Sequence, residues 1–224
     1  MASSSNGPLA LVGGNEWHPG CTFDRDLLEA SGGSEVLVVP TAAAYEHPER
    51  AVDCARQWFR GMGATVRGLD VLDRHDALDA AKAAIVCDAR FVYLSGGSPL
   101  HLRSVLKETP VWEALVAAWA QGAVVAGSSA GGMVLCDPMV DPRGGAFTVG
   151  LGLVVNLALL PHAEPDVAHH HHRTLELASP GLPLAAVAEE TALLRDTDGT
   201  WRAAGSGSVR VFVDGHEAGL DALP

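Results

Sequence analysis

The sequence predicts a single α/β domain built on a mostly parallel central sheet with helices on both faces. Short segments that are apolar throughout recur along the chain, as expected for strands buried on both faces. Segments with the spacing of amphipathic helices lie between them, and this alternation is typical of parallel sheets. The 224 residues, of which 48% are hydrophobic, suffice for one sizeable core. The predicted fold class is therefore a three-layer, flavodoxin-like sandwich.

Most strands of the first half follow a common pattern. Four of the five are short, mostly apolar runs that end in proline or are followed by glycine or a polar residue, whereas the segment 65–72 also contains Arg67 and Asp70. On this basis we expect strands at residues 8–12, 35–40, 65–72, 90–94 and 123–126. Their crossover connections should be right-handed.

Helices are expected between these strands. Phe23 and Leu27 share one face of the first helical segment, residues 23–30. Pro48 suits the first turn of the second segment, residues 48–62. The remaining helices are expected at residues 77–85, 100–106 and 111–119.

The pattern is less regular after residue 133. We expect irregular structure leading into a strand in residues 147–160, a helix in residues 169–177 and a strand within residues 184–194. A terminal hairpin is expected in residues 200–213, turning around residues 205–207. No linker interrupts the chain, so residues 1–224 are predicted to form one domain.

Composition excludes several classes of function. The formal net charge is −12 and no cluster of Lys or Arg could displace counterions from phosphates, so nucleic acid is not an expected partner. No apolar run is long enough to cross a bilayer, and the first residues lack the pattern of a secretory signal. The four cysteines lie far apart without a CxxC pair, which suits a reducing compartment. A cytoplasmic protein is expected.

The motif most indicative of chemistry is Gly-Ser-Ser-Ala-Gly at residues 127–131, which matches G-x-S-x-G. It directly follows the apolar strand predicted at 123–126. A serine on a sharp strand-to-helix turn needs small neighbours, and the next backbone N–H points toward a developing oxyanion. The motif predicts Ser129 as a nucleophile.

A serine nucleophile needs a base and a carboxylate that orients it. Among ten histidines, His162 stands out because it ends an apolar run, and the carboxyl ends of strands carry active residues in open α/β sheets. Glu189 and Glu190 interrupt another apolar segment. Because burying a carboxylate without partners is costly, one of the two is expected to have a specific role.

Five motifs in this order resemble those of the S51 serine peptidases, which include aspartyl dipeptidase and cyanophycinase. That family belongs to the class I glutamine amidotransferase-like superfamily. The motifs are an early Gly-Gly turn, a Gly-rich loop, the nucleophile turn, a histidine segment and an acidic segment, at residues 12–14, 93–98, 127–132, 151–162 and 188–193.

The resemblance implies a role for each matching residue. Ser129 would be the nucleophile, His162 the general base and Glu189 the orienting carboxylate, with Glu190 as the reserve for the acid. The backbone N–H groups of Gly97 and Ala130 would form the oxyanion hole, and the resemblance places substrate near Gly96 and Ser98. Asp137 and Asp141 are further options for the acid.

The resemblance also implies a substrate class and the absence of a cofactor. We expect a serine hydrolase that cleaves small peptides or isopeptides through an acyl-enzyme, with aspartyl-type bonds suggested by the family alone. Residues 95–98 replace the family's Gly-Gly-Gly-Asn-like loop, and residues 163–166 lack the aromatic and arginine pattern of cyanophycinase. No cofactor or metal is expected. Homodimer formation is compatible with the sequence, but no feature requires it.

Three alternatives remain open. A metal-dependent hydrolase could use His169–His172, although four consecutive histidines are not a ligand spacing. An ordinary α/β-hydrolase would need His216 as base with Asp196 or Asp198 as acid. A catalytically silent binding or sensor protein is the third, because fold alone does not establish function. A hydrogen-bonded chain from Ser129 through His162 to Glu189 would favour the serine hydrolase over these three alternatives.

Overall fold

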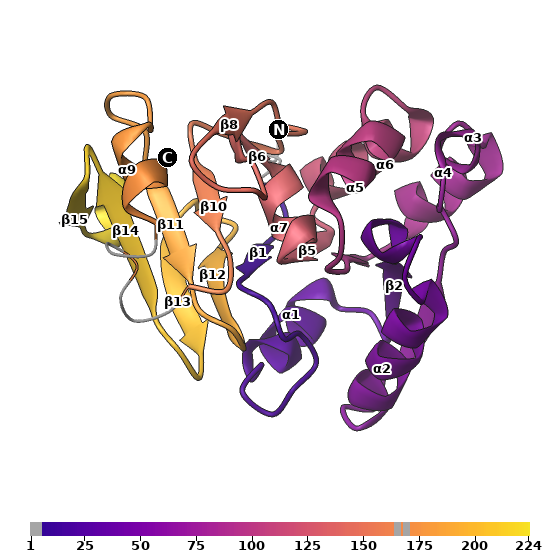
Figure 1. Cartoon of the computed structure of the whole chain (residues 1–224). Coiled ribbons are helices and arrows are strands. Elements are labelled where there is room, and N and C mark those ends of the chain that lie inside the picture. The colour runs from indigo at the N-terminus through magenta and orange to yellow at the C-terminus, as the bar shows by residue number, and fades with distance from the viewer. Residues whose placement is uncertain (1–5, 164–166, 168–170) are drawn as a thin grey trace, which may run out of the picture.

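The computed structural model describes residues 6–163, 167 and 171–224 of the chain. Figure 1 shows a broad α/β molecule in which the C-terminal strands form a second sheet beside the main one. No helix within the described residues is long and apolar enough to cross a membrane.

The main sheet has seven strands in the order β13-β12-β1-β5-β4-β2-β3. Five of them run parallel, and β12 and β13 are antiparallel additions beside β1. The bounds are β1 Leu9–Val12, β2 Glu35–Val39, β3 Thr65–Gly68, β4 Phe91–Leu94, β5 Val124–Ser128, β12 Thr191–Arg195 and β13 Trp201–Gly205. The predicted fold class, a mostly parallel sheet between layers of helices, is confirmed.

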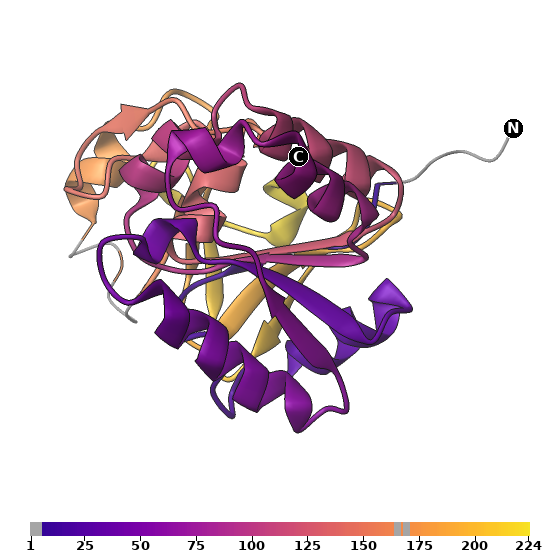
Figure 2. The same cartoon turned by 90° about the vertical axis from the view of Figure 1, so that its right-hand side faces the viewer.

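Helices cover both faces of this sheet. Figure 2 views the sheet nearly edge-on, with α2 below the strands and the magenta helices above. The bounds are α1 Phe23–Ser31, α2 Pro48–Arg60, α3 Arg74–Ala77, α4 Ala80–Asp88, α5 Pro99–Leu106, α6 Pro110–Ala120, α7 Ala130–Leu135 and α9 His172–Glu176, with short 3-10 turns η1 Thr41–Ala43 and η2 Leu220–Ala222.

Strand β1 explains why the central strands are apolar throughout. Leu9 and Leu11 face the core formed with α5, α6 and α7, whereas Ala10 and Val12 face the core formed with α1 and α2. Because side chains alternate along a strand, each strand supplies both cores, and all four side chains are fully buried.

The second sheet has four strands in the order β10-β11-β14-β15. Its strands are β10 Ala158–Leu160, β11 Leu184–Val187, β14 Val209–Val213 and β15 His216–Ala218. It packs through β10 and β11 against the same core as α5 to α7. Two small two-stranded sheets, which join β6 Cys136–Asp137 with β9 Val154–Val155 and β7 Met139–Val140 with β8 Phe147–Thr148, connect α7 to β10.

The second half of the chain differs from the sequence-based expectations in two places. The predicted terminal hairpin is wrong, because β13 pairs with β12 and β14 pairs with β11, so the two strands lie in different sheets. Residues 184–194 form two strands instead of one. In the first half, the helix predicted at 77–85 is divided into α3 and α4, and the strand predicted at 65–72 ends at Gly68.

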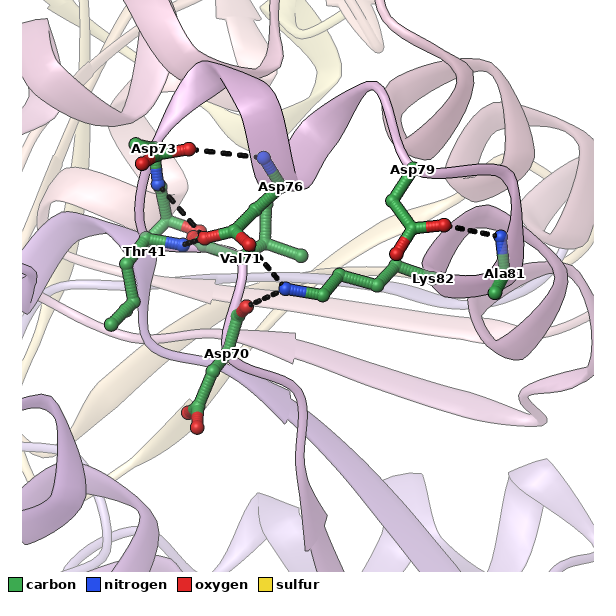
Figure 3. Close-up of polar contacts among 9 residues, drawn as sticks. Thr41, Asp70, Val71, Asp73, Asp76, Asp79, Ala81 and Lys82 are labelled. Atoms are coloured by element: carbon green, nitrogen blue, oxygen red, sulfur yellow. Dashed lines mark hydrogen bonds and ion pairs between the residues drawn. The ribbon is translucent and has the colours of Figure 1, made fainter.

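The connection from β3 to α4 is fixed by carboxylate hydrogen bonds (Figure 3) in addition to the buried side chains of Leu69, Val71 and Ala77. Asp76 Oδ2 accepts from Leu72 N at 2.9 Å, and Asp76 Oδ1 binds Lys82 Nζ, which also donates to the Asp70 carbonyl. Thr41 Oγ1 donates to the Val71 carbonyl and so ties η1 to this connection. The connection thereby supports η1, which contacts the Gly-rich loop after β4.

Candidate active site

The candidate site lies where three neighbouring parallel strands end. In the register of the sheet, Val12 of β1 pairs with Ser128 of β5, and Leu94 of β4 pairs with Gly127. The loops after these strands therefore meet at one edge of the sheet, as ligand sites do in open α/β folds.

Ser129 occupies a strained turn between β5 and α7. Its φ of 47° and ψ of −107° lie outside the regions that most residues adopt. A Cβ on Gly127 would lie 2.5 Å from the Gly131 carbonyl carbon, and a Cβ on Gly131 would lie 2.4 Å from the Leu94 carbonyl oxygen. The two glycines of the G-x-S-x-G motif are thus required for the chain to turn this sharply.

His162 follows β10 and reaches across to the main sheet. Its backbone N donates to the Gly13 carbonyl at 2.7 Å. Its imidazole packs on Gly14, where a Cβ would lie 2.2 Å from His162 Cε1. Nε2 lies 2.8 Å from Ser129 Oγ. The Gly-Gly turn after β1 therefore leaves room for the ring beside the serine.

Glu189 lies in the turn between β11 and β12, one residue before Glu190. Glu189 Oε1 is 2.9 Å from His162 Nδ1. The Glu190 carboxylate points elsewhere, to Asn15 Nδ2 at 2.9 Å and to Gly20 N at 2.8 Å. The structure thus brings Glu189 to the histidine and gives Glu190 a separate role in holding residues 15–20. Both glutamates lie in a turn and not, as predicted, within a strand.

The two aspartates considered as further options for the acid have other partners. Asp137 Oδ1 accepts from Gly150 N at 2.9 Å. Asp141 forms a two-pronged ion pair with Arg143, whose hydrogen bonds lower the pKa of Asp141 to about 2. Neither makes a recorded contact with His162 among the described residues.

The predicted oxyanion-hole donors lie on either side of Ser129. Gly97 has a φ of 135°, and a Cβ there would lie 2.3 Å from the Ala42 carbonyl oxygen of η1. Ala130 is the first residue of α7, where a backbone N–H has no acceptor within the helix. Among the described residues, neither of these two N–H groups has a hydrogen-bond acceptor.

The other two residues of the Gly-rich loop are occupied within the protein. Gly96 N donates to Glu16 Oε1 at 3.0 Å, and Ser98 Oγ caps α5 by accepting from His101 N. Gly96 lies beside Ser129, since a Cβ on Gly96 would lie 3.7 Å from Ser129 Cβ. The Gly96 N–H and the Ser98 hydroxyl, predicted to contact substrate, thus already have partners within the protein.

Two cavities adjoin this region. A pocket of about 230 Å³ opens beside Ser129 and His162 and is lined by the buried side chains of Met133, Val140 and Leu160. A larger cavity of about 810 Å³ lies between residues 15–19 and α2. Its lining includes Glu16 but not Ser129. The smaller pocket is the one that faces the serine.

The residues of the alternative interpretations have different positions. Of the histidine run, His169 and His170 lie outside the described residues, His171 lines the pocket beside Ser129, and His172 begins α9. No metal-binding group of three His, Cys, Asp or Glu side chains occurs among the residues described. His216 begins β15, which pairs with β14. Asp196 pairs with Arg202, and Asp198 accepts from Thr200.

One residue that was not among the predicted site residues is Glu16, whose position after the first strand suggested only that it could line the pocket. Its carboxylate binds both the Gly-rich loop and the turn that carries Ser129, through Gly96 N and Ser128 Oγ. These contacts join residues 80 and 112 positions apart. Only the position of Glu16 just after the first strand could have indicated it.

Solved structures share this fold. A peptidase from an acI-B1 actinobacterium superposes with a TM-score of 0.84 and 30% identity, covering 96% of this chain and 94% of that one. A candidate peptidase E from Listeria monocytogenes EGD-e superposes with a TM-score of 0.64 at 16% identity, covering 93% and 98%, and at that identity only the fold is compared. The fold is thus one that solved peptidase structures share.

Residues 10–201 match the model of peptidase family S51, and the chain belongs to that family. It is 28% identical over 216 residues to a cyanophycinase of Synechococcus elongatus and 27% identical over 215 residues to one of Trichormus variabilis. Each alignment covers 91% of this chain. The chain spans 66% of the length of the Synechococcus protein and 72% of the Trichormus protein.

Proposed function

We propose that the chain is a serine peptidase that cleaves small peptides or isopeptides through an acyl-enzyme. The observation that carries the proposal is the continuous chain of contacts from Ser129 Oγ to His162 Nε2 at 2.8 Å and from His162 Nδ1 to Glu189 Oε1 at 2.9 Å. Nucleophile, base and orienting acid lie within hydrogen-bond reach in the order that acyl transfer requires.

In the proposed mechanism, Glu189 accepts a hydrogen bond from the Nδ1–H of His162 and so fixes the tautomer whose Nε2 has a free lone pair. Nε2 takes the proton of Ser129 as its Oγ attacks the substrate carbonyl. The N–H groups of Gly97 and Ala130 donate to the oxyanion that forms. His162 then gives its proton to the leaving amine, and water releases the acyl group by the reverse sequence.

The substrate class rests on two considerations. The pocket beside Ser129 is about 230 Å³, which suits one side chain rather than a folded polypeptide. The curated relatives are cyanophycinases, so peptide and isopeptide bonds next to aspartyl residues are the first substrates to test.

Labelling with a fluorophosphonate tests this proposal, because such probes react only with an activated serine. We expect the parent protein to be labelled and Ser129→Ala and His162→Ala not to be. Ser104→Ala removes a hydroxyl on the exposed side of α5 and is the matched control that should label normally. Absence of labelling in the parent would contradict the proposal and favour the silent binding protein.

Dipeptides with an aspartyl residue on the acyl side, matched against the same dipeptides with asparagine, and β-aspartyl isopeptides, matched against γ-glutamyl isopeptides, then test the substrate class. Release of the free amine only from the aspartyl compounds is the expected result. Equal or no turnover of both sets by a protein that labels would retain the serine hydrolase and reject the aspartyl preference.

A further inference from the structure

Glu16 bridges two loops that the proposed mechanism requires to stay in register. Its Oε1 accepts from Gly96 N at 3.0 Å, and its Oε2 accepts from Ser128 Oγ at 2.7 Å. Gly96 directly precedes Gly97, and Ser128 directly precedes Ser129. One carboxylate therefore holds the residue before an oxyanion donor and the residue before the nucleophile.

The pairing between β4 and β5 does not extend to Gly96 and Ser128. It ends at the pair Leu94 and Gly127, although Ser128 still pairs with Val12 of β1. Beyond that pair, within the described residues, the carboxylate of Glu16 is a side-chain link between the Gly-rich loop and the end of β5. A Cβ on Gly96 would lie 3.4 Å from Glu16 Oε1 and 3.7 Å from Ser129 Cβ, so Gly96 lies between the carboxylate and the nucleophile.

The loop that carries Glu16 is held in an unfavourable backbone conformation. Asn15 and Trp17, on either side of Glu16, have φ values of 51° and 63°, which non-glycine residues rarely adopt. Such conformations persist only where surrounding contacts enforce them, and they cluster at functional sites.

Three contacts enforce the conformation of this loop. Glu190 accepts from Asn15 Nδ2 and from Gly20 N, one at each end. The Trp17 ring is buried against Tyr93, with ring centroids 5.2 Å apart. The chain is thus held so that the Glu16 side chain points at the edge of the sheet where the two loops meet.

We propose that Glu16 is a positioning residue for the acyl-transfer site, which holds the Gly97 and Ala130 donors at a fixed distance from each other around Ser129. The proposal rests on the proposed function. Glu16 acts through the two loops and does not touch the reacting atoms. It acts through the geometry of its two hydrogen bonds. One carboxylate oxygen accepts from Gly96, the residue before Gly97, and the other accepts from Ser128, the residue before Ser129.

The test compares the parent with Glu16→Ala, Glu16→Gln and Ser128→Ala by the rate of fluorophosphonate labelling, at several probe concentrations and pH values. In Glu16→Ala we expect the maximal rate to fall about 10- to 100-fold, because displaced donors stabilise the oxyanion less. The probe concentration at half-maximal rate and the pH midpoint should stay at the parental values, since His162 and the pocket are unchanged.

Glu16→Gln separates geometry from charge. The amide oxygen can accept from Gly96 N while the amide NH₂ donates to Ser128 Oγ, so most of the labelling rate should return. Ser128→Ala removes one of the two contacts of Glu16, and it can be measured even if Glu16→Ala does not fold. Its maximal labelling rate should lie between those of the parent and Glu16→Ala. Glu29→Ala, an exposed residue of α1, is the control that should label at the parental rate.

A second readout does not depend on labelling. Amide hydrogen exchange of the segment 95–98 should be faster in Glu16→Ala than in the parent and close to parental in Glu16→Gln, because the Gly96 N–H loses its acceptor only in the alanine variant. Parental exchange and a parental labelling rate in Glu16→Ala would overturn the proposal. A glutamine variant as slow as the alanine variant, with a shifted pH midpoint, would overturn it in favour of a charge effect.

The failure of the proposed function is distinguishable from the failure of this inference. If the parent were not labelled, and Glu16→Ala nevertheless exchanged faster at residues 95–98, Glu16 would hold the loop without serving catalysis. That result would reject both the proposed peptidase and the catalytic role of Glu16. A parent that labels, with a Glu16→Ala variant that labels equally well, would reject only the role of Glu16.

Discussion

Glu189 and Glu190 are adjacent in sequence, yet their carboxylates face different partners. Both lie in the turn between β11 and β12, where Glu190 has a φ of 52°. Glu189 contacts His162 with about half of its side chain exposed. Glu190 is bound by Asn15 and by the backbone of Gly20.

This difference predicts unequal effects of two otherwise identical substitutions. Under the proposed mechanism, Glu189→Gln should lower kcat by about 10²- to 10⁴-fold, because the amide no longer selects the correct tautomer of His162. Glu190→Gln should act mainly on stability, by about 1 kcal/mol for a weakened, partly buried contact. Turnover and thermal unfolding of both variants check this, and equal losses of kcat would contradict it.

At the residue scale, the sequence singled out Ser129, His162 and Glu189, which the structure brings into contact. Ser129 was predictable because its chemistry and its turn are encoded within five consecutive residues. The role of Glu16 was not predictable, because both of its contacts depend on pairing between strands far apart in sequence. Local patterns carry no information about such partners.

At the scale of elements, the Gly-Gly turn after β1 and the β10 segment meet at His162. Gly14 has a φ of 131°, and its missing side chain leaves the space that the imidazole fills. The turn is thus both a strand terminus and one wall of the site.

Gly14→Ala should therefore displace the imidazole from Ser129. We expect fluorophosphonate labelling to fall by about 100-fold, since a misplacement on the order of 1 Å can cost that much. Gly63→Ala is the matched control, because Gly63 also has a positive φ, 83°, but a Cβ added there would meet nothing within 4 Å. The control should lose about 1–3 kcal/mol of stability through backbone strain and still label normally. Comparable loss of labelling in both variants would rule out the steric explanation.

The predicted hairpin at residues 200–213 is an instructive error at this scale. Two strands do form there, β13 and β14, but each pairs with a strand made earlier in the chain. Strand propensity and a Gly-rich turn indicate strands and a reversal of direction, but they do not determine pairing. The turn at 206–208 instead passes the chain from one sheet to the other.

For the whole molecule, the layer below the main sheet contains a buried carboxyl group. Asp24 of α1 is fully buried and accepts from Trp58 Nε1 of α2 at 2.9 Å. Burial raises the pKa of Asp24 to about 8, well above its ordinary value of 3.8, although the Trp58 hydrogen bond opposes the shift. The folded protein therefore holds this group protonated at neutral pH.

This carboxyl should make the stability of the protein fall between pH 4 and pH 8. Because the pKa is higher in the folded state, its contribution is fully present below pH 3.8 and is lost as the pH rises toward 8. Asp24→Asn cannot ionise, so the free energy of unfolding of the variant minus that of the parent should increase over this range, by an amount on the order of a few kcal/mol. Urea unfolding at pH 4.5, 6, 7 and 8 measures the difference.

The matched control for this experiment is Asp26→Asn, because Asp26 is an exposed carboxyl of the same helix. Its difference from the parent should change much less with pH. If the Asp24→Asn difference were equally flat, Asp24 would be ionised in the folded protein and the burial argument would fail.

At this scale the parallel half of the fold was predictable and the second sheet was not. The central strands are apolar on both faces, as the strand β1 illustrates, and that pattern is specific to covered parallel sheets. Strands β10, β11, β14 and β15 are short and mostly lack a distinctive pattern, and their arrangement depends on contacts with the finished main sheet.

The order of the strands also has a consequence for biosynthesis. β1 is made before β12, which begins at Thr191, and the turn with Glu189 closes only when these two strands pair. A nascent chain that ends soon after Ser129 would thus carry the serine without its histidine and carboxylate. Under the proposed function, hydrolytic activity would begin only after β12 has been translated and has paired with β1.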